Sequence, residues 1–446
     1  MRKKLIIPKR VITVNHNNDI LSNIGIEITD SEITAFVPIN SVRPEEYEGE
    51  LFSYPELTLI PGFVQTHVHL CQTLFRGMAD DLQLLDWLQL KIFPFENAHD
   101  EASLKCSVRL GINELFLGGT TTILDMGTLR HQEVIFNELI ESGIRGFSGK
   151  CLIDQNDLFP AFKSDIENEL NYMNELAVSF HNTEQGRIKY GFAPRFALSC
   201  SEGLLKETKN MMDDFPGSVY HTHSSENKDE ITEVRKKYKK ENIEFFNSLG
   251  VLTDHTVLAH CIHVSEEEKK LLKTNNVRVA HCPSANLKLG SGIANIPDYL
   301  KRGISVSLGA DGPPCNNNLS AFTEMRLSAL IQKPLHGAEV MDSKTVFRLA
   351  TIEGAKALHL DKIIGSIEVG KKADLVLVDL NTNQNSVLDD DEQVYSNLIY
   401  ASGADCVKSV MVDGNWVVKD GQSEIYNSSE IKIESKKELN KLLKRL

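Results

Sequence analysis

The chain of 446 residues has no apolar run long enough to cross a membrane. Its basic start is followed by only three consecutive apolar residues, 5–7, before Pro8, which is too few for the core of a secretory signal. The eight cysteines are scattered and form no CxxC pair, which favours reduced thiols and a cytoplasmic protein. There is also no excess of positive charge. The formal charge of -14 argues against nucleic-acid or anionic-membrane partners.

What is present is the composition of a soluble globular protein, with 41% hydrophobic and 25% charged residues. Eight strand-like apolar runs alternate with helical stretches, such as the amphipathic segments 103–116, 228–246 and 265–273. The runs are 62–66, 121–125, 146–152, 188–193, 218–222, 256–260, 277–281 and 304–309. Strands alternating with helices in this number predict a (β/α)8 TIM barrel, an α/β fold, over residues 61–365.

Both ends of the chain read differently from its middle. Short strand patterns occupy 5–7, 11–14, 24–28 and 33–36, and others follow at 373–378, 407–412 and 416–419 around a hairpin signal, Asp413-Gly414. We therefore expect a small β-sandwich domain formed by both chain ends, from residues 1–60 and 366–446, with the barrel inserted between them. The charged segment 436–445 predicts a solvated terminal helix.

The most informative segment is PGFVQTHVH, residues 61–69. It reads as a short strand that ends in His67 and His69, and side chains two apart on a strand point the same way. Two adjacent imidazoles are half of a metal site. On their own they could equally be ordinary polar residues at the exit of a strand.

Other strand ends carry matching groups. His223 directly follows the fifth run, with Glu226 three residues further on. The sixth run ends at His260, and Asp311 lies two residues after the eighth. Barrel enzymes place their chemistry at this end of the strands. Three imidazoles and one carboxylate suit Zn²⁺ or Fe²⁺ with a position left for water, whereas a hard cation would need more oxygen ligands.

The residue types also predict a division of labour. A metal of this kind lowers the pKa of water toward roughly 7. Asp311 can bind the metal and accept the proton of the water, and His260, if it is not itself a ligand, can orient the attacking oxygen. Glu226 is placed to protonate a ring nitrogen and so make the attacked carbon electrophilic.

Alternatives remain at several positions. His221 faces the same way as His223 and could compete for the ligand role. His263 is a weaker candidate, and His281 could bind substrate or hold a loop. Cys261, Cys282 and Cys315 lie near the expected mouth of the barrel but are more typical of packing thiols.

These motifs resemble the amidohydrolase superfamily, in its branch of purine and triazine aminohydrolases and chlorohydrolases. The resemblance is carried by PGFVQTHVH, HSSE at 223–226, LAHC at 258–261, HCPSANLKLGSG at 281–292, LGADG at 308–312 and GSIEVGKKADL at 365–375. It implies one metal, Zn in preference to Fe, with His67, His69, His223 and Asp311 as ligands. It also implies Glu226 and His260 as proton-handling partners.

The substrate signals point in two directions. RGMADDL at 76–82 and FPFE at 93–96 resemble deaminases of S-adenosylhomocysteine, methylthioadenosine and 5′-deoxyadenosine, which implies that Glu96 holds ribose hydroxyls. Gln72, PRFALSC at 194–200 and SENKDE at 225–230 resemble guanine deaminases, which implies that Gln72 and Arg195 contact the base. The alternatives are structural roles: Arg195 could form an ion pair with a neighbouring acid, and Glu96 could be a carboxylate at the start of a helix.

We therefore expect a metal-dependent hydrolytic deaminase that releases ammonia from an adenine-containing nucleoside. Guanine deamination is the first alternative and hydrolysis of a triazine the second. A non-enzymatic barrel, the remaining class, should have lost ligands that are all present here. The expected partners are a small purine substrate, water and further copies of the chain in a homo-oligomer.

Overall fold

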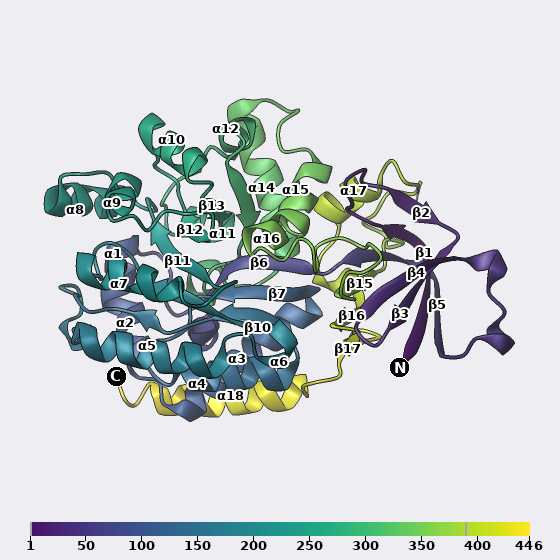
Figure 1. The fold of residues 1–446 in the computed structure, drawn as a ribbon, viewed down its shortest axis with the longest axis horizontal. Coiled ribbons are helices and arrows are strands. Elements are labelled where there is room, and N and C mark those ends of the chain that lie inside the picture. The colour runs from purple at the N-terminus through teal and green to yellow at the C-terminus, as the bar shows by residue number, and fades with distance from the viewer. Residues whose placement is uncertain (1, 389) are drawn as a thin grey trace.

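A computed structural model describes residues 2–388 and 390–446 (Figure 1). One of its two sheets is a parallel barrel with the strand order β6-β7-β8-β10-β11-β12-β13-β14. The strands are β6 (Phe63–Val68), β7 (Thr120–Asp125), β8 (Arg145–Ser148), β10 (Ile188–Pro194), β11 (Val219–Ser224), β12 (Thr256–His260), β13 (Arg278–His281) and β14 (Ser305–Leu308). Helices surround this sheet, which confirms the predicted TIM barrel.

The barrel closes where its last strand meets its first. Val68 forms a parallel bridge with Asp311, and the Asp311 backbone N–H donates to the carbonyl of His67 at 3.0 Å. Gly309 permits this approach, because a Cβ at that position would lie 2.7 Å from the His67 carbonyl oxygen. Closure therefore brings the residues after β14 beside those at the end of β6.

The barrel strands are buried on both faces, as β6 and β7 show along their whole length. Burial of this kind favours β-branched and apolar residues, which explains why the sequence predicted these strands. The run 146–152 is two strands, however, because β9 (Cys151–Leu152) follows β8 as a separate element. Gly149 lies between them, where a Cβ would meet the Gly191 carbonyl oxygen at 1.9 Å.

The helices on the first half of the barrel are α1 (Leu84–Trp87), α2 (Phe93–Asn97), α3 (Glu101–Leu117), α4 (Gln132–Ser142), α5 (Ile166–Phe180), α6 (Thr183–Gly186) and α7 (Glu202–Met212). The second half carries α8 (Lys228–Tyr238), α9 (Asn242–Ser248), α10 (Glu266–Thr274), α11 (Pro283–Lys288), α12 (Ile296–Lys301), α13 (Pro313–Asn316), α14 (Ala321–His336), α15 (Ser343–Leu349) and α16 (Ile352–Ala357). Within the described ranges, no helix combines the length and the apolar character needed to span a bilayer.

The prediction of one helix over 228–246 is wrong. Lys239 adopts a left-handed backbone conformation with φ of 56°, which ends α8. Glu241 then caps a new helix, α9, in a capping box with Glu244. The continuous amphipathic pattern hid this break.

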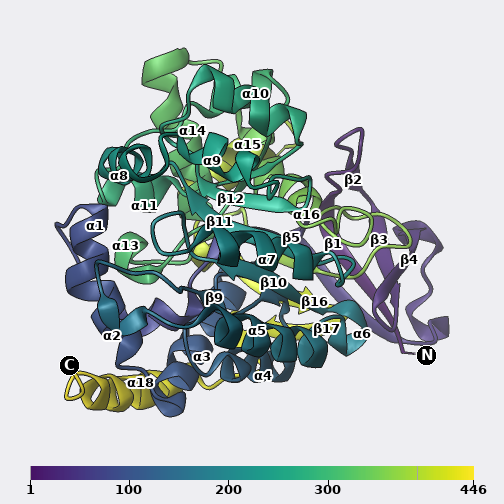
Figure 2. The same ribbon diagram turned by 60° about the vertical axis from the view of Figure 1, so that its left-hand side comes forward.

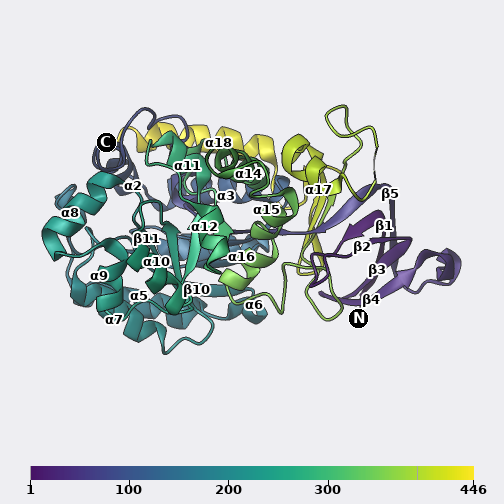
Figure 3. The same ribbon diagram turned by 90° about the horizontal axis from the view of Figure 1, so that it is seen from above.

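The second sheet joins the two ends of the chain, as expected (Figure 3). Its order is β18-β17-β16-β15-β5-β1-β3-β4, with β2 beside β1. The N-terminal strands are β1 (Lys3–Ile12), β2 (Ile20–Ser22), β3 (Ile24–Thr29), β4 (Glu32–Pro38) and β5 (Glu50–Pro61). The C-terminal strands are β15 (Leu375–Val378), β16 (Val407–Val412), β17 (Asn415–Lys419) and β18 (Gln422–Ser423), and α17 (Val394–Ser396) lies between β15 and β16.

Strand β5 is missing from the sequence prediction, although it is the central link of this sheet. It pairs in parallel with β1 and antiparallel with β15, so it joins the N-terminal strands to the C-terminal ones. Pro55 and Pro61 and the exposed residues of its first half conceal a strand pattern. The residue boundaries 1–60, 61–365 and 366–446 stay a prediction.

The C-terminal helix, α18 (Ser428–Leu442), runs along α3 (Figures 1 and 2). Its Leu442 side chain is fully buried in a cluster with Leu74, Phe75 and Phe95. The expectation of a solvated helix is therefore wrong on this face, and the helix starts earlier than 436. Its abundant charged residues, which suggested solvation, lie mainly on the opposite face.

Candidate active site

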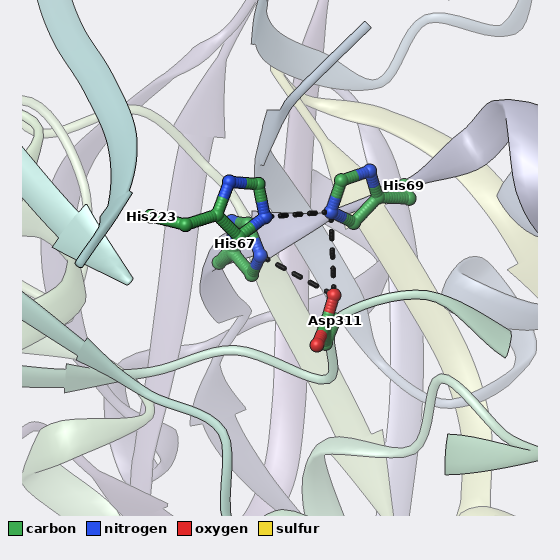
Figure 4. A group of neighbouring side chains, drawn as sticks. All are labelled: His67, His69, His223 and Asp311. Carbon is green, nitrogen blue, oxygen red and sulfur yellow. Dashed lines mark hydrogen bonds and ion pairs between the residues drawn. The ribbon is translucent and has the colours of Figure 1, made fainter. Parts of the chain in front are cut away.

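Four side chains from distant parts of the chain converge at the carboxyl end of the barrel (Figure 4). They are His67 on β6, His69 just after it, His223 on β11 and Asp311 after β14. The Asp311 Oδ1 atom lies 3.3 Å from the Nε2 atoms of both His67 and His69. The Nε2 atoms of His69 and His223 are 3.3 Å apart.

The chemistry of this group fits a transition metal. One ligand atom from each of the four side chains lies within 4.8 Å of all the others. Burial lowers the pKa of His67, His69 and His223, which keeps the imidazoles neutral with a lone pair available. Burial opposes ionisation of Asp311, but the hydrogen bond from His67 outweighs it and holds the Asp311 pKa well below its usual range. Three neutral nitrogens and a carboxylate are a zinc-type donor set.

Unusual backbone conformations surround the group. Ser225, His260 and Asp311 all have positive φ, at 55°, 73° and 62°. Residues other than glycine adopt this conformation at a cost, and such positions gather at functional sites. Each of these residues directs the chain sharply away from a strand end, so that the polar side chains stay at the mouth of the barrel.

Glu226 and His260 lie beside the four. The Nε2 atom of His260 is 3.5 Å from Glu226 Oε2 and 3.8 Å from Asp311 Oδ2. Burial raises the pKa of Glu226 well above its usual range, and the neighbouring charges of Asp311 and Glu230 raise it further. A buried carboxyl of this kind holds a proton that it can donate.

Asn286 on α11 is a residue that the sequence analysis missed. Its Oδ1 atom lies 2.8 Å from His260 Nδ1, so the His260 Nδ1–H can donate to it. That arrangement leaves the Nε2 lone pair of His260 facing Glu226 and Asp311. Asn286 belongs to the HCPSANLKLGSG motif, but its partner comes from a different strand end, and the motif alone does not reveal it.

A cavity opens onto this group. Its apolar wall comes from α1 and the following turn, from Phe196 and from Leu289. Its polar lining consists of His69, His223, Asp311, Glu226, Glu230, His260, Gln72 and Arg195. An apolar wall with a few convergent polar groups is the lining that small-molecule sites have.

Glu96 does not line the cavity, unlike Gln72 and Arg195. It is buried behind them on α2 and accepts from Arg195 Nη1 at 2.7 Å and from Gln72 Nε2 at 2.7 Å. Phe93 lies under the guanidinium, 5.1 Å from ring centroid to carbon. The carboxylate thus holds two cavity side chains in place, and the ion pair considered for Arg195 is present. A contact between Glu96 and ribose stays a prediction.

The remaining candidates fall outside the group of four. His221 contacts His67 at 2.8 Å, from ring nitrogen to ring nitrogen. His281 is fully buried and does not line the cavity, and His263 lies 2.7 Å from the Ser291 carbonyl oxygen. Cys261, Cys282 and Cys315 are fully buried, as packing thiols are.

Comparison with known proteins places this site in a family. The Amidohydrolase family matches residues 58–417, which span the barrel and extend into the strands on either side of it. The chain belongs to the amidohydrolase family.

Two curated relatives are similar to this chain over nearly their whole length. A 5-methylthioadenosine/S-adenosylhomocysteine deaminase of Desulfitobacterium hafniense is 33% identical over 94% of each chain. A 5'-deoxyadenosine deaminase of Methanocaldococcus jannaschii is 36% identical over 90% of this amidohydrolase and 92% of its own length.

A solved structure of a deaminase has the same fold as this chain. An adenosine deaminase from Xanthomonas campestris with bound zinc superposes with a TM-score of 0.92 and 28% identity, over 99% of each chain. The fold of this amidohydrolase is therefore also that of a zinc-binding deaminase.

Proposed function

We propose that this amidohydrolase is a metal-dependent hydrolytic deaminase of an adenine-containing nucleoside of the 5′-deoxyadenosine, methylthioadenosine or S-adenosylhomocysteine type. The observation that carries the proposal is the convergence of three imidazoles and a carboxylate on one cavity that also contains Glu226 and His260. The relatives at 33% and 36% identity support the class of reaction and the nucleoside.

The ligands that we propose for one divalent metal, Zn²⁺ in preference to Fe²⁺, are His67, His69, His223 and Asp311. Bound there, the metal would supply the Lewis acidity that activates water at neutral pH. The remaining steps belong to the protein. Water adds to the purine carbon that bears the amino group, that amine leaves as ammonia, and a carbonyl remains.

Proton movement falls to the cavity side chains in this proposal. Glu226, protonated because it is buried, donates to the ring nitrogen next to the attacked carbon. His260 keeps its Nε2 lone pair toward the site through its contact with Asn286, and it can hold a proton from the attacking water. Asp311 Oδ2 lies 3.8 Å from His260 Nε2 and can pass a proton to the departing amine.

Guanine deamination is a second candidate, and one observation favours it. The Glu96 carboxylate is occupied by Arg195 and Gln72, and these two side chains line the cavity in its place. The Gln72 Oε1 atom is buried and has no hydrogen-bond partner in the described part of the chain, so it can accept from a purine N–H. No observation favours a triazine.

The test is ammonia release from a panel of adenosine, 5′-deoxyadenosine, methylthioadenosine, S-adenosylhomocysteine and guanine. We expect turnover of the nucleosides. Turnover of guanine alone would replace the leading proposal with the second one. No turnover of any purine by metal-loaded protein would contradict both.

The variant E96Q separates two roles for Glu96. If the carboxylate binds ribose, kcat/KM falls about tenfold or more for nucleosides and hardly changes for a bare base. If it only holds Arg195 and Gln72, kcat/KM falls for every substrate. The variant E233Q, at a half-buried position on α8 outside the cavity lining, is the control and should match the parent protein.

We also propose a cytoplasmic location and a homo-oligomeric state. All eight cysteines are buried and unpaired, which suits a reducing compartment. Light scattering of the purified protein tests the oligomeric state directly.

A further inference from the structure

We propose that His221 is a positioning residue that fixes the tautomer and orientation of His67 and is not a metal ligand. The inference rests on the proposed function, because it concerns a metal held by the group of four. His221 and His223 lie on the same face of β11, and both point into the barrel. Only His223 belongs to the group of four.

The geometry couples the two imidazoles. The Nε2 atom of His221 lies 2.8 Å from Nδ1 of His67, and both side chains are fully buried. Their rings are nearly perpendicular, at 85° with centroids 4.9 Å apart. The two rings therefore do not stack, and the contact between their nitrogen atoms is a hydrogen bond.

The bond assigns the protons. His67 directs its Nε2 atom at Asp311 Oδ1, 3.3 Å away, so Nε2 is the atom that would bind a metal. A neutral imidazole that binds through Nε2 carries its proton on Nδ1, and this N–H donates to Nε2 of His221. His221 must then carry its own proton on Nδ1, since two N–H groups cannot share a 2.8 Å contact.

The second ring nitrogen of His221 is left without a hydrogen bond to any described residue in this arrangement, which is unfavourable for a buried polar atom. Its Nδ1 atom is buried and has no hydrogen-bond partner within the described residues. An apolar side chain of similar size would avoid an unpaired buried N–H. A histidine at this position is therefore explained by the acceptor that it offers to His67.

The test compares two variants in their affinity for Zn²⁺, measured by competition with a chelator. H221Q retains an acceptor atom, whereas H221F keeps a ring and removes the acceptor. We expect H221F to bind Zn²⁺ roughly 10–100-fold more weakly than the parent protein, and H221Q to stay within a few-fold of it. The matched control is H281F, which changes a fully buried histidine at the end of β13 and should leave the affinity unchanged.

Parent-like affinity in folded H221F would overturn the proposal. The visible spectrum of the Co²⁺-substituted protein tests the ligand role, because loss of a ligand changes coordination whereas loss of an outer hydrogen bond does not. A changed Co²⁺ spectrum in H221Q would make His221 a ligand and also overturn the proposal.

A measurement on the parent protein covers the case in which H221F does not fold. In the Zn²⁺-loaded protein with ¹⁵N-labelled histidine, NMR should show His67 and His221 both protonated on Nδ1. A proton on Nε2 of His221 would contradict the inference. If the parent protein binds no Zn²⁺ in the competition assay, the proposed function fails first, and the two failures are thereby distinguished.

Discussion

Glu226 is a carboxyl group withdrawn from water and surrounded by other acids. Its side chain is 5% exposed, and burial raises its pKa well above the usual range. We predict that E226Q keeps its metal and lowers kcat by roughly 10²-fold or more, because an amide has no acidic proton to donate. Steady-state ammonia release together with elemental analysis of the same sample measures both quantities.

The control for E226Q is E267Q, an acid that is 68% exposed on α10 and remote from the cavity lining. It should retain the parent kcat. Near-normal kcat in E226Q would show that another group supplies the proton. Loss of the metal would instead show that Glu226 supports the ligands.

At the scale of helices and strands, the sequence located the strand ends that carry the chemistry. The runs that precede His67, His223 and Asp311 are recognisable because buried strands are rich in β-branched and apolar residues. The sequence did not predict which side chains of different elements are in contact. Glu96 and Arg195 are 99 residues apart, and their pairing depends on how α2 lies against β10. The contact between Asn286 and His260 likewise depends on how α11 packs beside the end of β12.

Helix α18 shows why charge alone misleads. Its sequence is rich in Lys and Glu, yet Leu442 is fully buried against Phe75 and Phe95. We predict that L442A lowers the free energy of unfolding by about 2–5 kcal/mol, the usual effect of emptying a packed leucine site. Denaturant unfolding measures the change. I433A, which alters a residue of the same helix that is 71% exposed, should stay within about 0.5 kcal/mol of the parent protein.

Glu324 links three helices and gives the fold a pH dependence. It lies on α14 and accepts from the Ser284 backbone N–H on α11 at 3.1 Å and from Asn316 Nδ2 on α13 at 2.8 Å. Burial raises its pKa to about 7. The folded protein therefore binds this proton more tightly than the unfolded chain does. This contribution to stability is complete below the unfolded pKa and is lost as pH rises through about 7.

The variant E324Q tests this dependence, because its side chain does not titrate. We predict that the Tm of E324Q relative to the parent protein rises between pH 5 and pH 8. Scanning calorimetry of the two metal-loaded proteins at both pH values measures the difference. A difference that is constant with pH would mean that Glu324 is already ionised in the folded protein at pH 5.

At the scale of the whole molecule, a buried ion pair links the two sheets, and the proposed metal site links distant strands of the barrel. Arg145 on β8 forms a bidentate ion pair with Asp374, just before β15, at 2.9 and 3.0 Å. The pair is buried, so it fixes the sheet built from both chain ends against the barrel. The four candidate ligands lie on or directly after β6, β11 and β14, the first, a middle and the last strand of the barrel. A metal bound by them would link these strands.

A metal held by groups so far apart in the chain should stabilise the entire barrel, because the unfolded chain cannot assemble the site. A ligand at a thousandfold excess over its Kd stabilises the folded state by about 4 kcal/mol. We predict that removal of the metal by a chelator lowers Tm and abolishes ammonia release, and that Zn²⁺ restores both. D311A, which removes one candidate ligand, should begin with little metal and show no further fall in Tm with the chelator. Elemental analysis before and after treatment measures the metal, and unchanged Tm and activity after its complete removal would contradict the assignment of the site.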